Sequence, residues 1–200
     1  MQLTRWHSIA AMVATAAAIG GAVGCGGSSS STSSGASASN AAAEAKATAG
    51  GDIPDNQVFL TYGNTAGGYS LKYPEGWTRK VNGGSTTFTD KDNSISASVI
   101  AGPPATTASV SSQLATLQKA NPTLKAGKPQ QVKIGGAPVV KVTYTALGAK
   151  DPVTGKRLEI ITDRYEYSKG GKVAVLDLAT PKGVDNVDAY RMISESFKWK

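Results

Sequence analysis

The chain has 200 residues, with 21 Lys and Arg against 14 Asp and Glu, and a formal net charge of +7. It contains one histidine, His7, and one cysteine, Cys25, which excludes an intramolecular disulfide and a metal site built from several His and Cys ligands. The basic excess is modest and dispersed, so it favours anionic neighbours through long-range attraction but does not indicate nucleic-acid binding.

The N-terminal residues are typical of a secretory signal. Arg5 gives a positive start, and residues 9–24 form an uncharged, Ala-rich stretch. Ala22-Val23-Gly24-Cys25 resembles a bacterial lipobox, in which the cysteine thiol takes a diacylglyceryl group and becomes the first residue of the mature lipoprotein. We therefore predict a lipoprotein signal peptide over residues 1–24 and a palmitate-bearing anchor on Cys25, which would hold the protein on the extracytoplasmic side of the cell membrane. An uncleaved transmembrane anchor is the alternative, but a span needs ~20 strongly apolar residues.

The segment after Cys25 has the composition of a linker. Residues 26–51 are mostly Ser, Gly, Ala and Thr, and their only charged members are Glu44 and Lys46. Such a composition buries too little apolar area to offset chain entropy, so residues 25–51 are expected to form a lipidated cysteine followed by a disordered linker. Residues 52–200 are long enough for a single globular domain with its own core.

The domain begins with two expected strands, residues 58–62 and 69–73. In the second strand Tyr69, Leu71 and Tyr73 alternate with polar residues, as in a half-buried strand. Tyr73-Pro74-Glu75-Gly76 has the residues of a type I turn, after which Trp77 is expected to fold back over the strand. Two interpretations of Tyr69, Tyr73 and Trp77 stay open: an aromatic plug at one end of the core, or the mouth of a ligand pocket.

The remaining elements follow from hydrophobic periodicity. We expect a hairpin of residues 86–89 and 94–101, a helix over 107–120, a short strand over 130–134, a meander of residues 140–147, 157–167 and 172–180, and a final helix. The turns of the meander are too short for helical crossovers, so its strands are antiparallel. Asp185 is the expected N-cap of the last helix, whose core-facing residues are Val187, Tyr190, Ile193 and Phe197. Runs of strands with two separate helices predict an α+β domain.

This order of elements resembles the PsbP-like fold, which is shared by an extrinsic accessory subunit of photosystem II, a nuclear-import factor that binds a small GTPase, and bacterial lipoproteins. The segment Tyr69-Ser-Leu-Lys-Tyr-Pro-Glu-Gly-Trp77 and the ending Ser196-Phe-Lys-Trp199 carry the likeness, and the layout is also similar to that of actinobacterial LpqN-type lipoproteins. The resemblance implies an α/β/α sandwich on an antiparallel sheet of about six to seven strands. It also implies a scaffold that binds partners, and it supplies no catalytic residue.

Motifs for cofactor chemistry are absent from the sequence. No GxxxxGK(S/T) loop is present and no GxGxxG follows a strand, so nucleotide binding has no support. Asp90-Lys-Asp-Asn93 resembles the start of a calcium loop, but Ile95 stands at the glycine position and Ala101 at the bidentate glutamate position, so a plain hairpin turn is favoured. Because His7 lies in the signal, the mature chain also lacks the histidine of a catalytic triad. We therefore expect no cofactor and no metal.

Carboxylates offer the remaining route to acid/base chemistry. Asp177 lies in an apolar run, where a carboxylate must be paired or face outward, and pairing with a Lys or Arg of a neighbouring strand is the simpler expectation. Glu159 and Asp163 are four residues apart on one expected strand, about 13 Å, which is far for direct cooperation. A hydrolase that uses Asp177, or Glu159 with Asp163, is the least favoured function.

One part of the domain is strongly basic. From Lys125 to Arg157 there are seven basic residues and a single acid, Asp151. This asymmetry predicts a basic edge, centred on Lys150, Lys156 and Arg157 at the tip of an expected hairpin, that docks on anionic headgroups or an acidic partner. A solubilising surface without a specific partner is the alternative.

The sequence thus predicts a non-enzymatic, membrane-anchored lipoprotein whose domain binds or supports another envelope component, either an envelope protein or an anionic lipid or polymer. The alternative function is a carrier that holds a small or lipid-like ligand in a pocket between sheet and helix, with Tyr69, Tyr73 and Trp77 near its mouth. A large apolar cavity would favour the carrier, and a filled core would favour the accessory module. Nucleic acid is not an expected partner.

Overall fold

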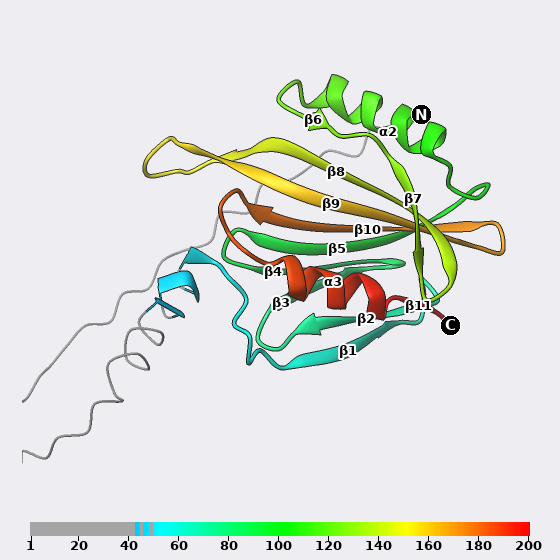
Figure 1. Ribbon diagram of the computed structural model, residues 1–200, viewed down its shortest axis with the longest axis horizontal. Coiled ribbons are helices and arrows are strands. Elements are labelled where there is room, and N and C mark those ends of the chain that lie inside the picture. Colours follow the sequence, from blue (N-terminus) through cyan, green and yellow to red (C-terminus); the bar gives the residue numbers. More distant parts are fainter. Residues whose placement is uncertain (1–42, 45, 49) are drawn as a thin grey trace, which may run out of the picture.

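The computed structural model describes residues 43–44, 46–48 and 50–200 (Figure 1). The predicted signal peptide, the lipobox-like segment and Cys25 lie outside the described residues. Residues 43–44, 46–48 and 50 are helical, which differs from the disordered linker expected over this part of residues 25–51. Among the described residues no helix combines the length and the hydrophobicity that a membrane span requires.

An antiparallel sheet of eight strands forms the centre of the domain, in the order β3-β4-β5-β10-β9-β8-β6, with β7 paired to β8. Its strands are β3 (Thr78–Asn82), β4 (Ser85–Asp90), β5 (Asn93–Ala101), β6 (Lys125–Ala126), β7 (Gln130–Ile134), β8 (Ala137–Lys150), β9 (Arg157–Lys169) and β10 (Lys172–Pro181). The predicted α+β class and the antiparallel meander, now β8, β9 and β10, are confirmed. The predicted six to seven strands are too few, because β3 exposes all five residues and β6 has only two, so neither shows an alternating pattern.

A second, smaller sheet has three antiparallel strands in the order β1-β2-β11, namely β1 (Phe59–Asn64), β2 (Tyr69–Pro74) and β11 (Lys198–Trp199). The turn after β2 lies one residue later than predicted. The Trp77 amide donates to the Pro74 carbonyl at 3.4 Å, and Gly76 occupies the third position of the turn with φ +89°. A positive φ at the third position matches a type II turn rather than the predicted type I.

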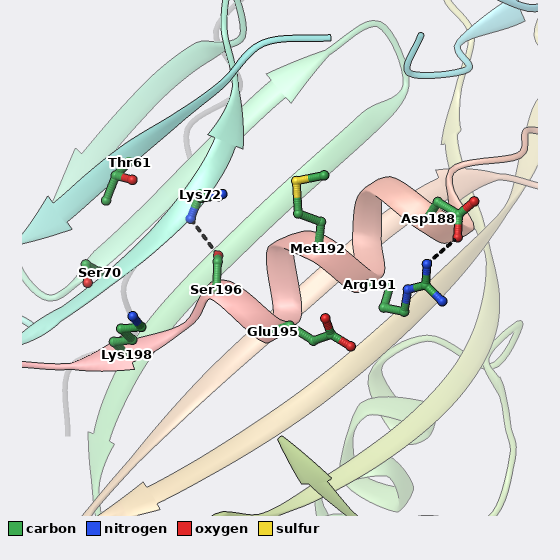
Figure 2. A pocket seen from close by; sticks show the side chains of 9 residues that line it. All are labelled: Thr61, Ser70, Lys72, Asp188, Arg191, Met192, Glu195, Ser196 and Lys198. Atoms are coloured by element: carbon green, nitrogen blue, oxygen red, sulfur yellow. Dashed lines mark hydrogen bonds and ion pairs between the residues drawn. The ribbon is translucent and has the colours of Figure 1, made fainter. Parts of the chain in front are cut away.

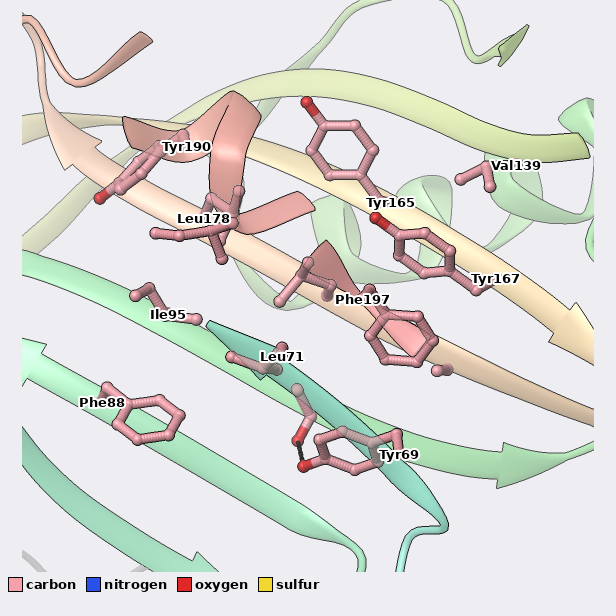
Figure 3. Packing of buried hydrophobic residues seen from close by; sticks show 14 residues of the cluster. Tyr69, Leu71, Phe88, Ile95, Val139, Tyr165, Tyr167, Leu178, Tyr190 and Phe197 are labelled. Atoms are coloured by element: carbon pink, nitrogen blue, oxygen red, sulfur yellow. Dashed lines mark hydrogen bonds between the residues drawn. The ribbon is translucent and has the colours of Figure 1, made fainter. Parts of the chain in front are cut away.

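The main hydrophobic core lies between the large sheet, the small sheet and helix α3 (Val187–Ser196) (Figure 3). We call this side of the large sheet the α3 face. Tyr167 and Phe197 stack with ring centroids 4.2 Å apart, and Phe197 stacks on Tyr69 at 5.7 Å. Such aromatic pairs add about 0.5–1.5 kcal/mol each beyond their buried area. The buried members of this core are Tyr69, Leu71, Phe88, Ile95, Ala97, Val139, Tyr165, Tyr167, Ala174, Leu176, Leu178, Tyr190, Ile193 and Phe197.

Helix α3 begins one residue later than predicted. Asn186, and not Asp185, is the N-cap residue, and its side chain makes no capping hydrogen bond to the helix. Of the residues expected to face the core, Tyr190, Ile193 and Phe197 are buried, but Val187 is 73% exposed. Val187 lies in the first turn, at the rim of a surface cavity described below, so it does not reach the core.

The Asn186 side chain instead helps to fix the point at which the chain enters the domain. Its amide nitrogen donates to Asn93 Oδ1 at 3.2 Å and to Thr180 Oγ1 at 3.1 Å, and its Oδ1 accepts from the Ile53 amide at 2.7 Å. Asn93 Nδ2 donates to the Gly51 carbonyl at 2.6 Å. Because buried amides must be hydrogen-bonded, this network ties the N-terminal segment to the start of α3 and to the β4–β5 turn.

Helix α2 (Thr107–Ala120) covers part of the opposite side of the large sheet, which we call the α2 face. Its bounds agree with the prediction, and Thr106 forms a capping box with Ser109 at its N-terminus. The hydrophobic cluster between this helix and the sheet is small. Its buried members are Val110, Leu114, Val140 and Val142.

Candidate functional site

The three aromatic residues considered for a pocket mouth belong to the core. Tyr69 has no exposed surface, and its hydroxyl donates to Thr86 Oγ1 at 3.0 Å. Tyr73 is half-buried and stacks on Phe88 with ring centroids 4.3 Å apart, and Trp77 packs against the same core. None of the three lines a cavity described below. The position of Tyr69 is therefore that of a plug within the core, and the expectation that it lies at a pocket mouth is corrected.

The expected basic hairpin tip is the connection between β8 and β9, which extends beyond the other strands (Figure 1). Lys150, Lys156 and Arg157 are exposed there, and Lys150 pairs with Arg157 across the two strands. Asp151 organises the loop, since its Oδ1 accepts from the Thr154 amide at 2.6 Å. Hydrogen bonds from the Thr154 backbone and hydroxyl hold the pKa of the Asp151 carboxyl below its usual value. The tip thus presents three basic side chains around one fixed carboxylate.

Two of the carboxylates considered for acid/base chemistry are held by basic partners. Arg164 forms a bidentate ion pair with Asp177, with Nε–Oδ1 and Nη2–Oδ2 distances of 2.8 Å, which confirms the predicted pairing with a neighbouring strand. Glu159 accepts from Lys182 Nζ at 2.8 Å, and this hydrogen bond holds the pKa of Glu159 below its usual value. A carboxyl with a lowered pKa is unsuited to act as a general acid near neutral pH. Within the described residues no group of three or more His, Cys, Asp and Glu is placed to hold a metal ion.

Glu166 is a buried carboxylate that sequence reasoning missed. It lies on β9 beneath α2 with 1% of its surface exposed, and its Oε2 accepts from Gln113 Nε2 at 3.3 Å. Its Oε1 has no hydrogen-bond partner among the described residues. Burial raises the pKa of Glu166, and the hydrogen bond from Gln113 and the charge of Arg164 oppose that rise. The alternation of the strand could have revealed its position. Tyr165 and Tyr167 face the α3 side of the sheet, so Glu166 between them must face the α2 side.

A groove of about 700 Å³ lies between α3 and the small sheet (Figure 2). We call it the α3 groove. Its volume is in the range of ligand-binding clefts. Strand residues line one side and helix residues the other, and together they are Thr61, Ser70, Lys72, Asp188, Arg191, Met192, Glu195, Ser196 and Lys198.

Strand register makes the first side of the α3 groove basic. Lys198 is opposite Ser70 and Thr61 is opposite Lys72, so the two lysines stand on neighbouring positions of the small sheet. Lys200 Nζ lies next to Gly63, where a Cβ would collide with it. The three strands contain no acidic residue, and Lys72, Lys198 and Lys200 take part in none of the ion pairs between described residues.

The helix side of the α3 groove has a different character. Asp188 and Arg191 form an ion pair at 2.9 Å, whereas Glu195 is exposed and takes part in no ion pair among the described residues. Met192 is 42% exposed and projects from the same helix in a different direction from Glu195 (Figure 2). The Lys72 amide donates to Ser196 Oγ at 2.8 Å, which holds β2 against the end of α3. The groove therefore has lysines on one side and an unpaired acid with an apolar side chain on the other.

A second cavity of about 360 Å³ opens between α3 and strands β8, β9 and β10. Its lining is mainly apolar and includes Leu178, Val184 and the exposed Val187. Its polar lining includes an ion pair between Lys141 and Asp163, with an Nζ–Oδ2 distance of 2.9 Å. The alternative ligand pocket was expected between sheet and helix, and this cavity has that position, although other residues line it.

Solved structures resemble the chain in fold. The solution structure of the cyanobacterial PsbP protein CyanoP from Synechocystis sp. PCC 6803 matches with a TM-score of 0.55 and 19% identity, over 75% of this chain and 98% of that chain. The Saccharomyces cerevisiae Ran-binding protein Mog1p matches with a TM-score of 0.48 and 10% identity, over 72% and 96%. LpqN, involved in cell envelope biogenesis of Mycobacterium tuberculosis, matches with a TM-score of 0.40 and 14% identity, over 72% and 85%. No protein-family model and no protein of curated function matches the sequence. The likeness to CyanoP shows that the chain has the PsbP-like fold, as the sequence predicted.

Proposed function

We propose that this chain is a non-enzymatic binding module of the cell envelope, which docks on another envelope component through the α3 groove. The groove is the observation that supports this function. The core beneath it is filled by aromatic and aliphatic side chains, while the groove exposes Lys72 and Lys198, which pair with no carboxylate of the described chain. Unpaired charge on a concave surface favours a charged partner through electrostatic complementarity.

A role without catalysis is supported by the placement of the carboxylates. Asp177 is tied to Arg164, and Glu159 is tied to Lys182. Burial raises the pKa of Glu166, but this carboxyl lies beneath α2 and lines none of the cavities described above. Acid/base catalysis requires access to the substrate as well as a suitable pKa. We therefore infer binding rather than chemistry.

The envelope location is inferred from the N-terminal residues. The lipobox-like segment that ends at Cys25 favours a lipid anchor there, and two acyl chains suffice for stable attachment to a membrane. The tract of Ser, Gly, Ala and Thr that follows would place the domain at a distance from the anchor. A tethered domain with an exposed groove fits an accessory role beside another envelope protein.

Affinity capture from detergent-solubilised envelopes tests this function. The full chain would carry a tag within residues 30–40, which leaves the domain and Cys25 unchanged. We expect a partner in stoichiometric amount with the wild type and its loss with Lys72→Glu/Lys198→Glu. Lys128→Glu/Lys133→Glu is the matched control, because it makes the same charge change at two exposed lysines outside the groove. Equal capture by both double variants would contradict docking through the groove, and a chain without any partner would contradict the binding module.

A carrier of a small ligand is the second candidate, and the cavity between α3 and strands β8–β10 favours it. About 360 Å³ with a mainly apolar lining fits a small amphiphile rather than a lipid with two long chains. Native mass spectrometry of the protein extracted from the envelope would show a bound ligand as added mass. Val184→Trp fills the cavity and should remove that mass. A ligand bound one to one and lost in this variant would make the carrier the better function, whereas protein without added mass would contradict it.

A further inference from the structure

We infer that the partner in the α3 groove is a protein segment that places acidic side chains on the strand side and an apolar and a basic side chain on the helix side. This inference rests on the proposed function and names the class of its partner. The two sides of the groove present different chemistry, and only a polymer with several kinds of side chain complements both.

The strand side requires acidic groups. Lys72 and Lys198 line the groove from neighbouring register positions, and Lys200 lies next to Gly63 on the adjoining strand. The hydroxyls of Thr61 and Ser70 stand among these lysines and serve as further donors. Because the three strands of the small sheet contain no acid that would compete, a carboxylate from a partner can form ion pairs with these lysines.

The helix side requires an apolar and a basic group. Asp188, Met192 and Glu195 recur at four- and three-residue spacing, so they form one stripe along α3. Seven residues of helix span about 10 Å, the length of about three residues of extended chain. Met192 is exposed and adapts its shape to an apolar side chain, while Glu195 offers an unpaired carboxylate to a Lys or Arg.

This mixture of charges disfavours the other classes of anionic partner. A phosphate polymer that entered the groove would bring its charges close to Glu195 and Asp188, and like charges at an interface are repulsive. A bilayer is flat and does not enter a groove between a helix and a sheet. The β8–β9 tip suits a planar anionic surface better, because its three basic residues stand on a protruding hairpin (Figure 1).

Site-specific photo-crosslinking in the producing bacterium tests the inference on the full, anchored chain. A p-benzoylphenylalanine would replace Met192 in the groove, and a second strain would carry it in place of Val153, which is 92% exposed at the β8–β9 tip, as the matched control. We expect the groove probe to link to a protein peptide that carries Asp or Glu within about three residues of the linked position. Lys72→Glu/Lys198→Glu should lower the yield about tenfold, and exchange of those partner acids for Lys should restore it.

The outcomes separate this inference from the proposed function. Three results would overturn the assignment of an acidic protein segment as the partner. The groove probe could link to lipid or glycan, or it could link to a protein segment without acids. The yield of cross-links could also stay unchanged in Lys72→Glu/Lys198→Glu. If affinity capture still returns a partner in that case, the binding module stands and only the assignment of its partner fails. If neither capture nor cross-linking returns a partner, both fail. Restoration of the yield by the charge exchange would establish the direct contact.

Discussion

The two faces of the large sheet are built differently. On the α3 face a cluster of 14 buried apolar residues joins the large sheet to a helix and a second sheet, whereas the cluster on the α2 face has four buried members and joins the sheet to a single helix. The α2 face also contains the Arg164–Asp177 ion pair and the unpaired oxygen of Glu166. We therefore expect the α3 face to contribute more to the free energy of unfolding than the α2 face. The α3 groove lies on the same side of the large sheet, between α3 and the small sheet. On the α2 face the ion-paired side chains of Arg164 and Asp177 keep 11% and 23% of their surface exposed, while Glu166 is buried.

The largest effect should come from truncation of the core on the α3 face. Leu176 on β10 has no exposed surface, and Leu176→Ala should lower the free energy of unfolding by about 3–4 kcal/mol, because a cavity remains in a densely packed region. Leu114→Ala on the α2 face is the comparison, with an expected loss of about 2 kcal/mol since α2 can shift to fill the space. Urea unfolding monitored by circular dichroism measures both. An equal or larger loss for Leu114→Ala would contradict the difference between the faces.

The ion pair of the α2 face provides the second prediction. Arg164→Met leaves Asp177 partly buried without its partner and should cost about 2–3 kcal/mol, somewhat less than for a fully buried pair because both side chains keep some solvent contact. Arg164→Met/Asp177→Leu removes both charges and should regain most of the loss. A double variant that is less stable than Arg164→Met would show that the pair itself, and not the unpaired charge, determines stability. Chemical denaturation of the three proteins side by side is the measurement.

Glu166 should make stability depend on pH in a direction unusual for a carboxyl. Burial raises its folded-state pKa above the unfolded value of about 4.3. Between these two values the folded state binds more protons than the unfolded state, so stability from this group is present at low pH and is lost as pH rises through the folded pKa. Glu166→Gln resembles the protonated form and should be more stable than the wild type at pH 8, with a smaller difference near pH 4.

Thermal unfolding of both proteins from pH 4 to pH 8 checks this dependence. Arg164 and Asp177 act on the charge of Glu166 and remain in the variant, so the comparison reports the titration of Glu166 in their presence. Gln113→Leu removes the one hydrogen bond to Glu166 and should steepen the loss of stability with rising pH. A Glu166→Gln protein with the pH profile of the wild type would show that this carboxyl is not the group that titrates.

The smallest effect on stability should come from the α3 groove. Lys72 and Lys198 are exposed and unpaired among the described residues, so Lys72→Glu/Lys198→Glu should change the free energy of unfolding by no more than about 0.5 kcal/mol. Binding of the partner should fall in the same variant. A large loss of stability would mean that these lysines hold the small sheet together and would weaken their assignment to binding.

Much of the fold could be predicted because patterns of apolar and polar residues within short segments indicate its helices and strands. Helix α2 was predicted with its observed bounds, since apolar spacing marks its buried side and Asn121-Pro122 ends it. Strand β5 alternates Ile95, Ala97 and Val99 with serines, and it faces the core as expected. Strand β3 was missed because its five residues are all exposed, so burial left no pattern in them.

The candidate site was much harder to predict. The sequence predicted that Asp177 is paired, because an isolated charge in an apolar strand is unfavourable. It could not predict that the partner is Arg164, because that depends on the register of β9 and β10. The aromatic residues Tyr69 and Tyr73 were correctly placed on the inner side of a strand, yet whether that side met a pocket or a core was a question of packing. Lys150 and Arg157 belong to one basic stretch of the sequence, whereas Lys72 and Lys198 are far apart in the sequence and come together only through the pairing of β2 and β11.

The sequence by itself determined most of the strands, the helices α2 and α3, the antiparallel meander and the PsbP-like order of elements, because hydrophobic periodicity and turn residues act between near neighbours in the chain. Only the tertiary structure decided the α3 groove. Its lining combines β1 and β2 near the start of the domain with α3 and β11 at its end, and the hydrogen bond between Lys72 and Ser196 joins residues 124 positions apart. Such contacts depend on the packing of the whole core, which no local pattern encodes.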